Sequence, residues 1–222
     1  MLVAAAVCPC PPLLVPEVAA GAAPELDARP DLLVVVGPAE QSGRGAHPQG
    51  TAGSFRGFGV DVQVRLGPAT GAVPERELPP SLAVAAWLLE RTGWADAPIE
   101  GLGIGEPLAP ERCIGAGRDI AARAGRVALL VMGDASACRT LKAPGYLDER
   151  AAPFDAGIAR ALGTADVPAL QALDAGLADE LKASGRAPWQ VLAGAAEGAG
   201  LAGALLYDDA PYGVGYLVAS WS

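Results

Sequence analysis

An apolar run that ends abruptly in polar residues constrains the fold of this chain most. Residues 127–132 read Val-Ala-Leu-Leu-Val-Met, and Gly133, Asp134 and Ser136 follow at once. A run that is apolar at every position is typical of a central strand covered on both faces. Open α/β sheets bind their ligands just beyond the carboxyl ends of such strands. We therefore expect a central parallel strand here, with polar groups of a ligand site directly after it.

The remaining pattern predicts strands and helices mixed along the whole chain. The expected strands are Leu2–Val7, Leu32–Val36, Val60–Leu66, Gly101–Ile104, Val127–Met132, Ala204–Tyr207 and Val214–Ser220. The expected helices are Glu17–Glu25, Leu82–Thr92 with Ser81 as its N-cap, Pro110–Ala124, Phe154–Leu162, Pro168–Ala183 and Trp189–Ala196. The long stretch Pro38–Gly59 has little periodicity and predicts an irregular loop. This pattern indicates the α/β class: one domain over residues 1–222, with a mostly parallel or mixed central sheet and helices on both faces.

Composition and charge exclude several classes of protein. Hydrophobic residues make up 51% of the 222 residues and charged residues 18%, as in a globular and not a disordered chain. No apolar stretch reaches the ~18 residues of a membrane span. The formal net charge of −9 disfavours nucleic acid and anionic membranes as partners. The start of the chain lacks the basic residues of a signal peptide. We expect a cytoplasmic protein with a small-molecule ligand, and a homo-oligomer stays open.

The four cysteines are Cys8, Cys10, Cys113 and Cys138, and they form neither a C-x-x-C pair nor a zinc ribbon. In a reducing compartment we expect free thiols. Cys8 and Cys10 stand two residues apart, so both side chains point to the same face of an extended strand. Cys8 itself is expected to be a small core residue.

Three segments resemble the catalytic, B-type subunit of class III extradiol ring-cleavage dioxygenases. They are Gly133-Asp-Ala-Ser, Cys8-Pro-Cys-Pro-Pro-Leu-Leu and Tyr207-Asp-Asp-Ala-Pro-Tyr-Gly-Val. The resemblance implies an α/β domain related to enzymes that hold Fe(II) with two histidines and one carboxylate, a set that leaves positions open for substrate and O₂. In those relatives a ligand histidine follows strand one, where this chain matches best with Cys10. An acid/base histidine follows the Ser, where this chain has Ala137.

Cys10, Glu40 and His47 are the candidate metal ligands, for Fe(II) or Zn(II). A Cys10 thiolate favours zinc or a softer iron site, and the alternative is a substitution that removed the metal site. Glu40 follows the second strand, and its alternative is a solvated charge. His47 is the single histidine, and we expect it in a solvated loop. On that expectation, His47→Ala leaves the metal content unchanged and shifts the thermal midpoint negligibly.

Asp134, Ser136 and His47 are the catalytic candidates. Asp134 and Ser136 also suit a structural role, because such side chains often bond nearby backbone N–H groups and define a turn. Arg139 suits a bidentate contact with a substrate carboxylate, or an ion pair with Asp134 or Asp148. The candidate pocket residues are Cys10, Glu40, Arg139, Asp209 and Tyr212.

Two functions are consistent with these residues. One is a divergent member of the extradiol family that keeps a small-molecule pocket at the sheet edge without ordinary ring cleavage. The other is an active metal-dependent dioxygenase-type oxidoreductase for a small aromatic compound. Ala137 favours the first, since losing a positioned proton-transfer group costs ~10²–10⁴ in rate. In either case we expect Cys8, Cys10, Glu40, Asp134 and Asp209 to gather at one edge of the sheet.

Overall fold

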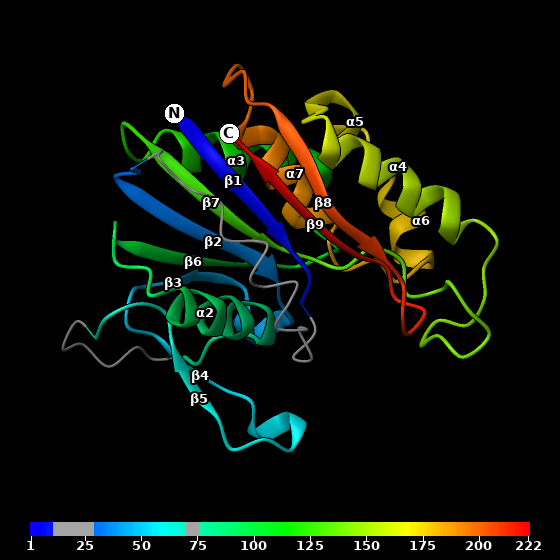
Figure 1. Ribbon diagram of the computed structural model, residues 1–222, viewed down its shortest axis with the longest axis horizontal. Coiled ribbons are helices and arrows are strands. Elements are labelled where there is room, and N and C mark those ends of the chain that lie inside the picture. The colour runs from blue at the N-terminus through cyan, green and yellow to red at the C-terminus, as the bar shows by residue number, and fades with distance from the viewer. Residues whose placement is uncertain (11–28, 70–75) are drawn as a thin grey trace.

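The computed structural model describes residues 1–10, 29–69 and 76–222, and its centre is a seven-stranded sheet (Figure 1). The strand order is β3-β6-β2-β7-β1-β9-β8. The bounds are β1 Leu2–Cys8, β2 Leu32–Pro38, β3 Gly45–His47, β6 Ile99–Ile104, β7 Val127–Met132, β8 Gly203–Asp209 and β9 Tyr216–Trp221. The four central strands β6, β2, β7 and β1 are parallel, whereas β3, β9 and β8 run antiparallel to their neighbours. The expected α/β class with a mixed sheet is confirmed.

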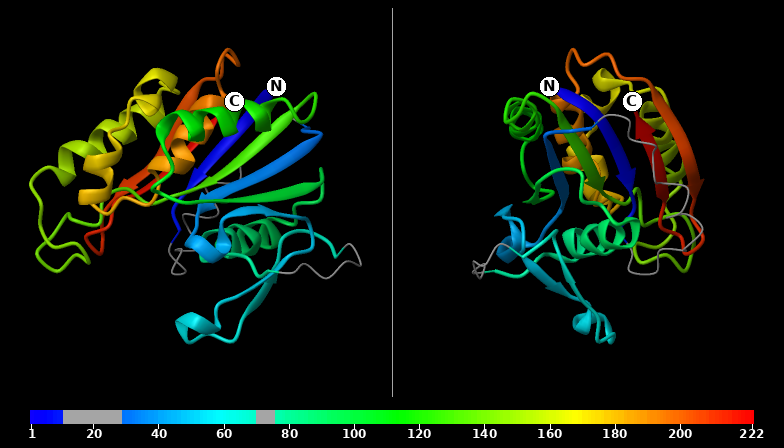
Figure 2. Two further views of the ribbon diagram at one scale, coloured as in Figure 1. Left: turned by 180° about the vertical axis from the view of Figure 1, so that it is seen from behind. Right: turned by 60° about the vertical axis from the view of Figure 1, so that its left-hand side comes forward.

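Helices cover both faces of this sheet (Figure 2). Their bounds are α2 Pro80–Thr92, α3 Pro110–Ala121, α4 Ala151–Gly163, α5 Val167–Gln171, α6 Ala175–Glu180 and α7 Arg186–Ala195. A small second sheet pairs β4 Ala52–Ser54 with β5 Gln63–Arg65, and single 3₁₀ turns cover Gln41–Gly43 and Arg56–Phe58. Within the described residues, every helix is too short or too polar to cross a membrane.

The alternation of side chains along the central strands divides the core into two layers. Val34 and Val36 of β2 point into the layer that holds Trp189 of α7. Val35, between them, points into the opposite layer with Leu82 of α2. Both layers are apolar, which explains why β2 and β7 are apolar at every position. The central strands β2 and β7 therefore carry no polar side chain, and the polar groups near them lie in the loops beyond their ends.

Two glycines let α3 and α7 approach until their backbones touch. A Cβ on Gly117 of α3 would collide with the carbonyl oxygen of Val191, and a Cβ on Gly194 of α7 would collide with that of Ile114. Gly115, on the same helix α3, faces open space. The helix pair thus depends on the absence of a side chain at two positions that face each other.

The Gly117→Ala variant should lose ~1–3 kcal/mol of unfolding free energy, the usual cost of overpacking a dense core. The matched control is Gly115→Ala, which meets no atom and should gain ~0.5–1 kcal/mol from the better helix propensity of alanine. Urea denaturation of both variants measures the difference. Equal stabilities for the two variants would contradict the close backbone contact.

Some expected elements are placed differently. The single helix predicted for 168–183 is divided into α5 and α6, because the buried amide of Gln190 takes the carbonyls of Gln171 and Leu173 out of the helical ladder. Asp174 then caps α6 by accepting from the N–H groups of Gly176 and Leu177. The helix predicted for 17–25 lies outside the described residues.

Three further expectations are corrected by the structure. Ser81 is not an N-cap: α2 begins one residue earlier, and the Ser81 hydroxyl donates to the carbonyl of Pro38 at 2.7 Å. The stretch predicted as an irregular loop, 38–59, contains β3 and β4. The half-exposed strand predicted for 60–66 is limited to β5, over Gln63–Arg65. Short strands of this kind carry too few residues for periodicity to reveal them.

Candidate functional site

The loop after β7 crosses over the carboxyl end of β1 and builds the candidate site. The N–H of Gly133 donates to the carbonyl of Cys8 at 3.0 Å, which continues the β1–β7 pairing. The next residues pair with the chain that enters β9: Ala135 donates to Gly215, and Gly215 donates to Ser136, each at 2.8 Å. The loop therefore bridges two strands on either side of β1 and brings its side chains above the end of β1.

Asp134 joins this loop to the segment after β1. Its Oδ1 accepts a hydrogen bond from the backbone N–H of Cys10 at 2.7 Å. Burial raises the pKa of Asp134 to about 6, although that hydrogen bond opposes the shift. Burial, then the charge of Asp134, raise the pKa of the Cys10 thiol well above its ordinary value. The expected pair therefore does meet, and at neutral pH Cys10 is a neutral thiol and not a nucleophilic thiolate.

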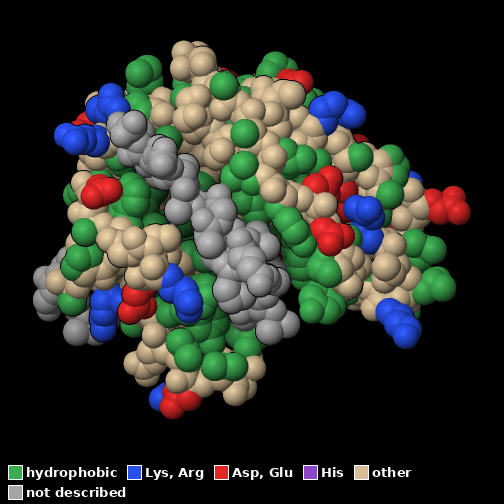
Figure 3. Space-filling view, in the orientation of Figure 1, with side chains coloured by type: hydrophobic (Ala, Val, Ile, Leu, Met, Phe, Trp, Pro, Cys, Tyr) green, Lys and Arg blue, Asp and Glu red, His purple; other side chains and the backbone are tan. Residues whose placement is uncertain are grey.

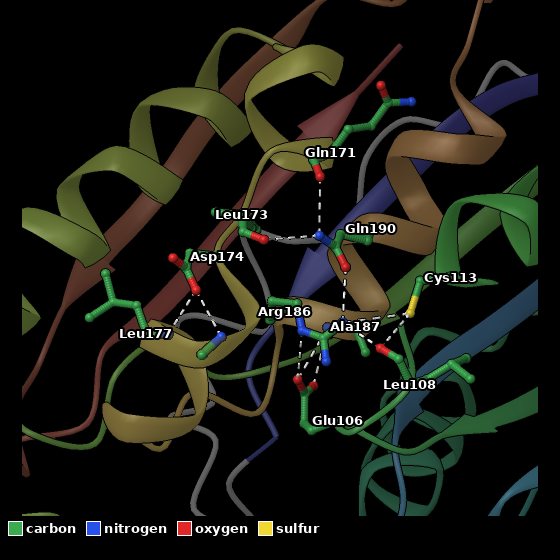
Figure 4. Close-up of polar contacts among 11 residues, drawn as sticks. Glu106, Leu108, Cys113, Gln171, Leu173, Asp174, Leu177, Arg186, Ala187 and Gln190 are labelled. Atoms are coloured by element: carbon green, nitrogen blue, oxygen red, sulfur yellow. Dashed lines mark hydrogen bonds and ion pairs between the residues drawn. The ribbon is translucent and has the colours of Figure 1, made fainter. Parts of the chain in front are cut away.

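Glu106 is a second carboxyl group at this edge, two residues after β6. Burial raises its pKa to about 7, although the guanidinium of Arg186 opposes the shift. Its carboxylate accepts from the N–H of Ala187 at 3.2 Å, in the first turn of α7, and lies 3.4 Å from Nε of Arg186 (Figure 4). Glu106 also acts on the Cys10 thiol through its charge. Asp134 and Glu106, two carboxyl groups whose pKa values are raised toward neutrality, thus both raise the pKa of the Cys10 thiol.

Arg186 is a buried cation that joins the start of α7 to the residues after β6. Its side chain is 2% exposed. Nη1 donates to the carbonyl of Leu108 at 2.8 Å and to the side chain of Gln190 at 3.0 Å, and it contacts Sγ of Cys113 at 3.8 Å (Figure 4). Among the described residues, Nε has no hydrogen-bond partner, and its ion-pair partner is Glu106. A buried guanidinium with one carboxylate partner fixes the start of α7 against the end of β6.

A group of phenols lies on the other side of Asp134. Burial, then the charges of Asp134 and Tyr212, raise the pKa of Tyr216 at the start of β9. Tyr216 pairs across the hairpin with Asp209, the last residue of β8. Tyr212, in the turn between β8 and β9, is 68% exposed. Asp209 and Tyr212 thus reach the expected edge, and Tyr216 lies between them and Asp134.

Ser136 and Arg139 are tied to a carboxylate that their positions in the sequence do not reveal. Asp155 in α4 is fully buried and accepts from the backbone N–H and the hydroxyl of Ser136, each at 2.8 Å. It also pairs with Nη1 of Arg139 at 3.0 Å. The partner of Arg139 is therefore Asp155, and not Asp134 or Asp148. The Ser136 hydroxyl attaches the loop to α4 through Asp155. This role is structural, but it differs from the expected hydrogen bond to a nearby backbone N–H.

The loop that follows Arg139 packs on the turn between β8 and β9. A Cβ on Gly213 would lie 2.6 Å from atoms of Thr140 and Ala143. The same loop exposes the apolar side chains of Leu141, Tyr146 and Leu147. Figure 3 shows hydrophobic side chains on the side of the molecule where this loop lies in Figure 1. Polar groups at the edge are thus bordered by an apolar rim.

The structure does not bring the three candidate metal ligands together. Within residues 1–10, 29–69 and 76–222, no group of three His, Cys, Asp or Glu side chains could hold a metal ion. Glu40 is exposed and lies in a separate hollow with Arg76 and Pro79. Cys10, in contrast, lies against Asp134.

His47 corrects a further expectation, because it is buried and not solvated. It belongs to β3 and pairs with Gly101 of β6, and its ring Nε2 is 2.8 Å from the carbonyl oxygen of Gly43. The residue is 2% exposed. Because the substitution would remove a buried contact and leave a cavity, we now expect His47→Ala to lower the thermal midpoint, in place of the negligible shift expected for a solvated histidine.

Sequence reasoning missed Glu106, Asp155, Arg186 and Tyr216. Glu106 had a readable signal, because it follows the strand over Gly101–Ile104 as closely as Asp134 follows β7. Tyr216 lies within the predicted strand Val214–Ser220 and looks like an ordinary strand residue. Asp155 and Arg186 lie in or at the start of helices, where a charged residue usually faces solvent.

Comparison with known proteins adds a fold and no function. No family model matches the sequence, and no curated protein matches it. Among solved structures, the protein is similar to an uncharacterized protein, JW3007, from Escherichia coli K12. The two share 14% sequence identity over 99% of each chain, with a TM-score of 0.51. At this identity the likeness concerns the fold alone.

The raised pKa of the buried Asp134 predicts a specific pH dependence. A carboxyl group whose folded pKa is raised holds its proton longer in the folded state, so stability falls as pH rises from about 4 to about 6. Asn keeps the acceptor for Cys10 but cannot ionise. We compare the unfolding free energy of Asp134→Asn with that of the unsubstituted protein. From about pH 4.5 to about pH 7.5, the difference should change by ~2 kcal/mol in favour of Asp134→Asn.

Urea denaturation at the two pH values measures this shift. The control is Asp61→Asn, because the Asp61 side chain is 77% exposed and should show no such change with pH. A stability difference between Asp134→Asn and the unsubstituted protein that is the same at both pH values would contradict the raised pKa of Asp134.

Proposed function

We propose that this protein is a divergent member of the class III extradiol dioxygenase-like family that binds a small molecule at the carboxyl edge of its sheet and does not carry out ordinary catechol ring cleavage. The observation that carries the proposal is the meeting of Cys10 with Asp134, together with the electrostatic influence of Glu106 on Cys10 and of Asp134 on Tyr216. These groups come from four separate parts of the chain. Their place at the ends of parallel strands is where open α/β sheets bind ligands.

The chemistry of these groups favours a ligand with hydroxyl or carbonyl groups. Near neutral pH, Asp134 and Glu106 each exchange a proton, so each can donate or accept a hydrogen bond. The phenol of Tyr216 and the thiol of Cys10 add neutral polar contacts. The exposed apolar side chains beside the edge, such as Tyr212, suit an aromatic ring.

The donor set does not fit the Fe(II) site of ring-cleaving relatives. Such a site takes two imidazoles and a carboxylate on one face of the metal. The single histidine, His47, lies in β3 with its ring against the Gly43 carbonyl. The residue after Ser136 is Ala137, whose backbone pairs with Leu181 and Gly145. The proposed function therefore contains no step at iron.

The first test is an activity assay. Protein loaded anaerobically with Fe(II) is mixed with protocatechuate and related catechols, and O₂ is then admitted. We expect no ring cleavage, because the chain lacks both the histidine ligands and the acid/base histidine. Turnover on the order of 1 s⁻¹, in the normal range for enzymes, would overturn this part of the proposal.

The second test is ligand binding without turnover. Protocatechuate should raise the thermal midpoint of the protein, because a ligand bound only to the folded state stabilises it. Tyr216→Phe and Asp134→Asn should reduce this ligand-dependent rise. Glu40→Gln is the matched control, since Glu40 lies in a separate hollow and its loss should leave the rise unchanged. A rise that is equally large in all three variants would place the ligand elsewhere.

A further inference from the structure

Sulfur atoms gather at the carboxyl ends of β1 and β7, on the face covered by α2. Cys8 and Met132 are register partners in the parallel pairing of these strands, so they lie on neighbouring strands about 4.8 Å apart. Both side chains belong to the apolar layer that also contains Leu130 and Val35. A thiol and a thioether therefore lie side by side in a dry environment.

Cys10 extends this row by one position. It stands two residues beyond Cys8, as Asp134 stands two residues beyond Met132. The hydrogen bond from Cys10 N–H to the side chain of Asp134 shows that the two segments remain close to each other past the ends of their strands. Cys10 also packs against the same apolar layer as Cys8 and Met132, but it is only partly buried. Cys10 is thus the sulfur-bearing residue next to Cys8 and Met132 that is partly exposed to solvent.

We propose that Cys8, Cys10 and Met132 form a binding site for a soft monovalent cation, with Cu(I) as the expected ion. Thiolate and thioether sulfurs are the ligands that select Cu(I), whereas an oxygenase Fe(II) site takes imidazole and carboxylate. On binding, two Cu–S bonds form to the cysteine sulfurs and the two thiol protons leave to solvent, while Met132 donates a lone pair. No electron is transferred in this step.

Proton release makes the affinity depend on pH. Burial raises the pKa of Cys8 to about 12 and that of Cys10 well above its ordinary value, so Cu(I) must displace a proton from each thiol. Affinity should therefore rise as pH rises. Since Cys8 and Met132 lie in the α2-side core layer, this inference goes beyond the proposed small-molecule function and does not depend on it.

Anaerobic competition with the chromogenic Cu(I) chelator bicinchoninate tests the site on the full, reduced protein. We expect one equivalent of Cu(I) to be withdrawn from the chelator, with tighter binding at higher pH. Cys10→Ser and Cys8→Ala should each abolish this competition. Met132→Leu conserves volume and should weaken binding about tenfold, the scale on which a supporting group around a metal contributes.

The matched controls are the two remaining cysteines. Cys113 lies in the core layer on the opposite face of the sheet, and Cys138 lies under α4 and Leu181, so Cys113→Ser and Cys138→Ser should bind Cu(I) normally. Folding of each variant is checked by circular dichroism. If Cys8→Ala does not fold, Cys10→Ser and Met132→Leu still decide the question. Absent competition, equal loss in the control variants, or unchanged affinity in Met132→Leu would overturn the three-sulfur site.

Discussion

The passage of the loop 133–139 over the end of β1 is the constraint on which the rest of the structure depends. β1 lies between β7 and β9, so this loop must cross it to reach the chain entering β9. A crossing over the end of a buried strand exposes backbone groups that need partners. The side chain of Asp134 accepts a hydrogen bond from the N–H of Cys10, and the side chain of Asp155 accepts one from the N–H of Ser136. The carboxylates that hold the crossing also create the candidate site.

The same requirement explains why the carboxyl groups of the site have raised pKa values. A carboxyl group that serves a backbone N–H at the end of a covered sheet loses most of its water, so the charged form becomes costly. Asp134 meets this cost by holding its proton to a higher pH. Burial also raises the pKa of Glu106, although the charge of Arg186 offsets part of this shift. Carboxyl groups that accept backbone hydrogen bonds thus also exchange protons near neutrality. A binding or catalytic site requires this property.

Much of the architecture could be predicted because it rests on local patterns. The uninterrupted apolar runs at Leu32–Val36 and Val127–Met132 indicated central strands, and both strands are central. The meeting of Cys10 and Asp134 followed from their positions after parallel strands. The break between α5 and α6 could not be read locally, because its cause is the side chain of Gln190, 17 or more residues away. The strand that contains His47 was equally hidden, since three residues carry no period.

The sequence by itself determined which segments are buried, the α/β class, and the residues that follow each central strand, because side-chain period and strand length are local properties. It also determined that one histidine is present, which limits the metal sites available to the chain. Only the tertiary structure decided the partners. The partners in each pair are separated by 16 to 124 residues along the chain. The pairs are Ser136 with Asp155, Arg139 with Asp155, Glu106 with Arg186, and Cys8 with Met132. Such pairs depend on strand order and helix placement, which no local pattern encodes.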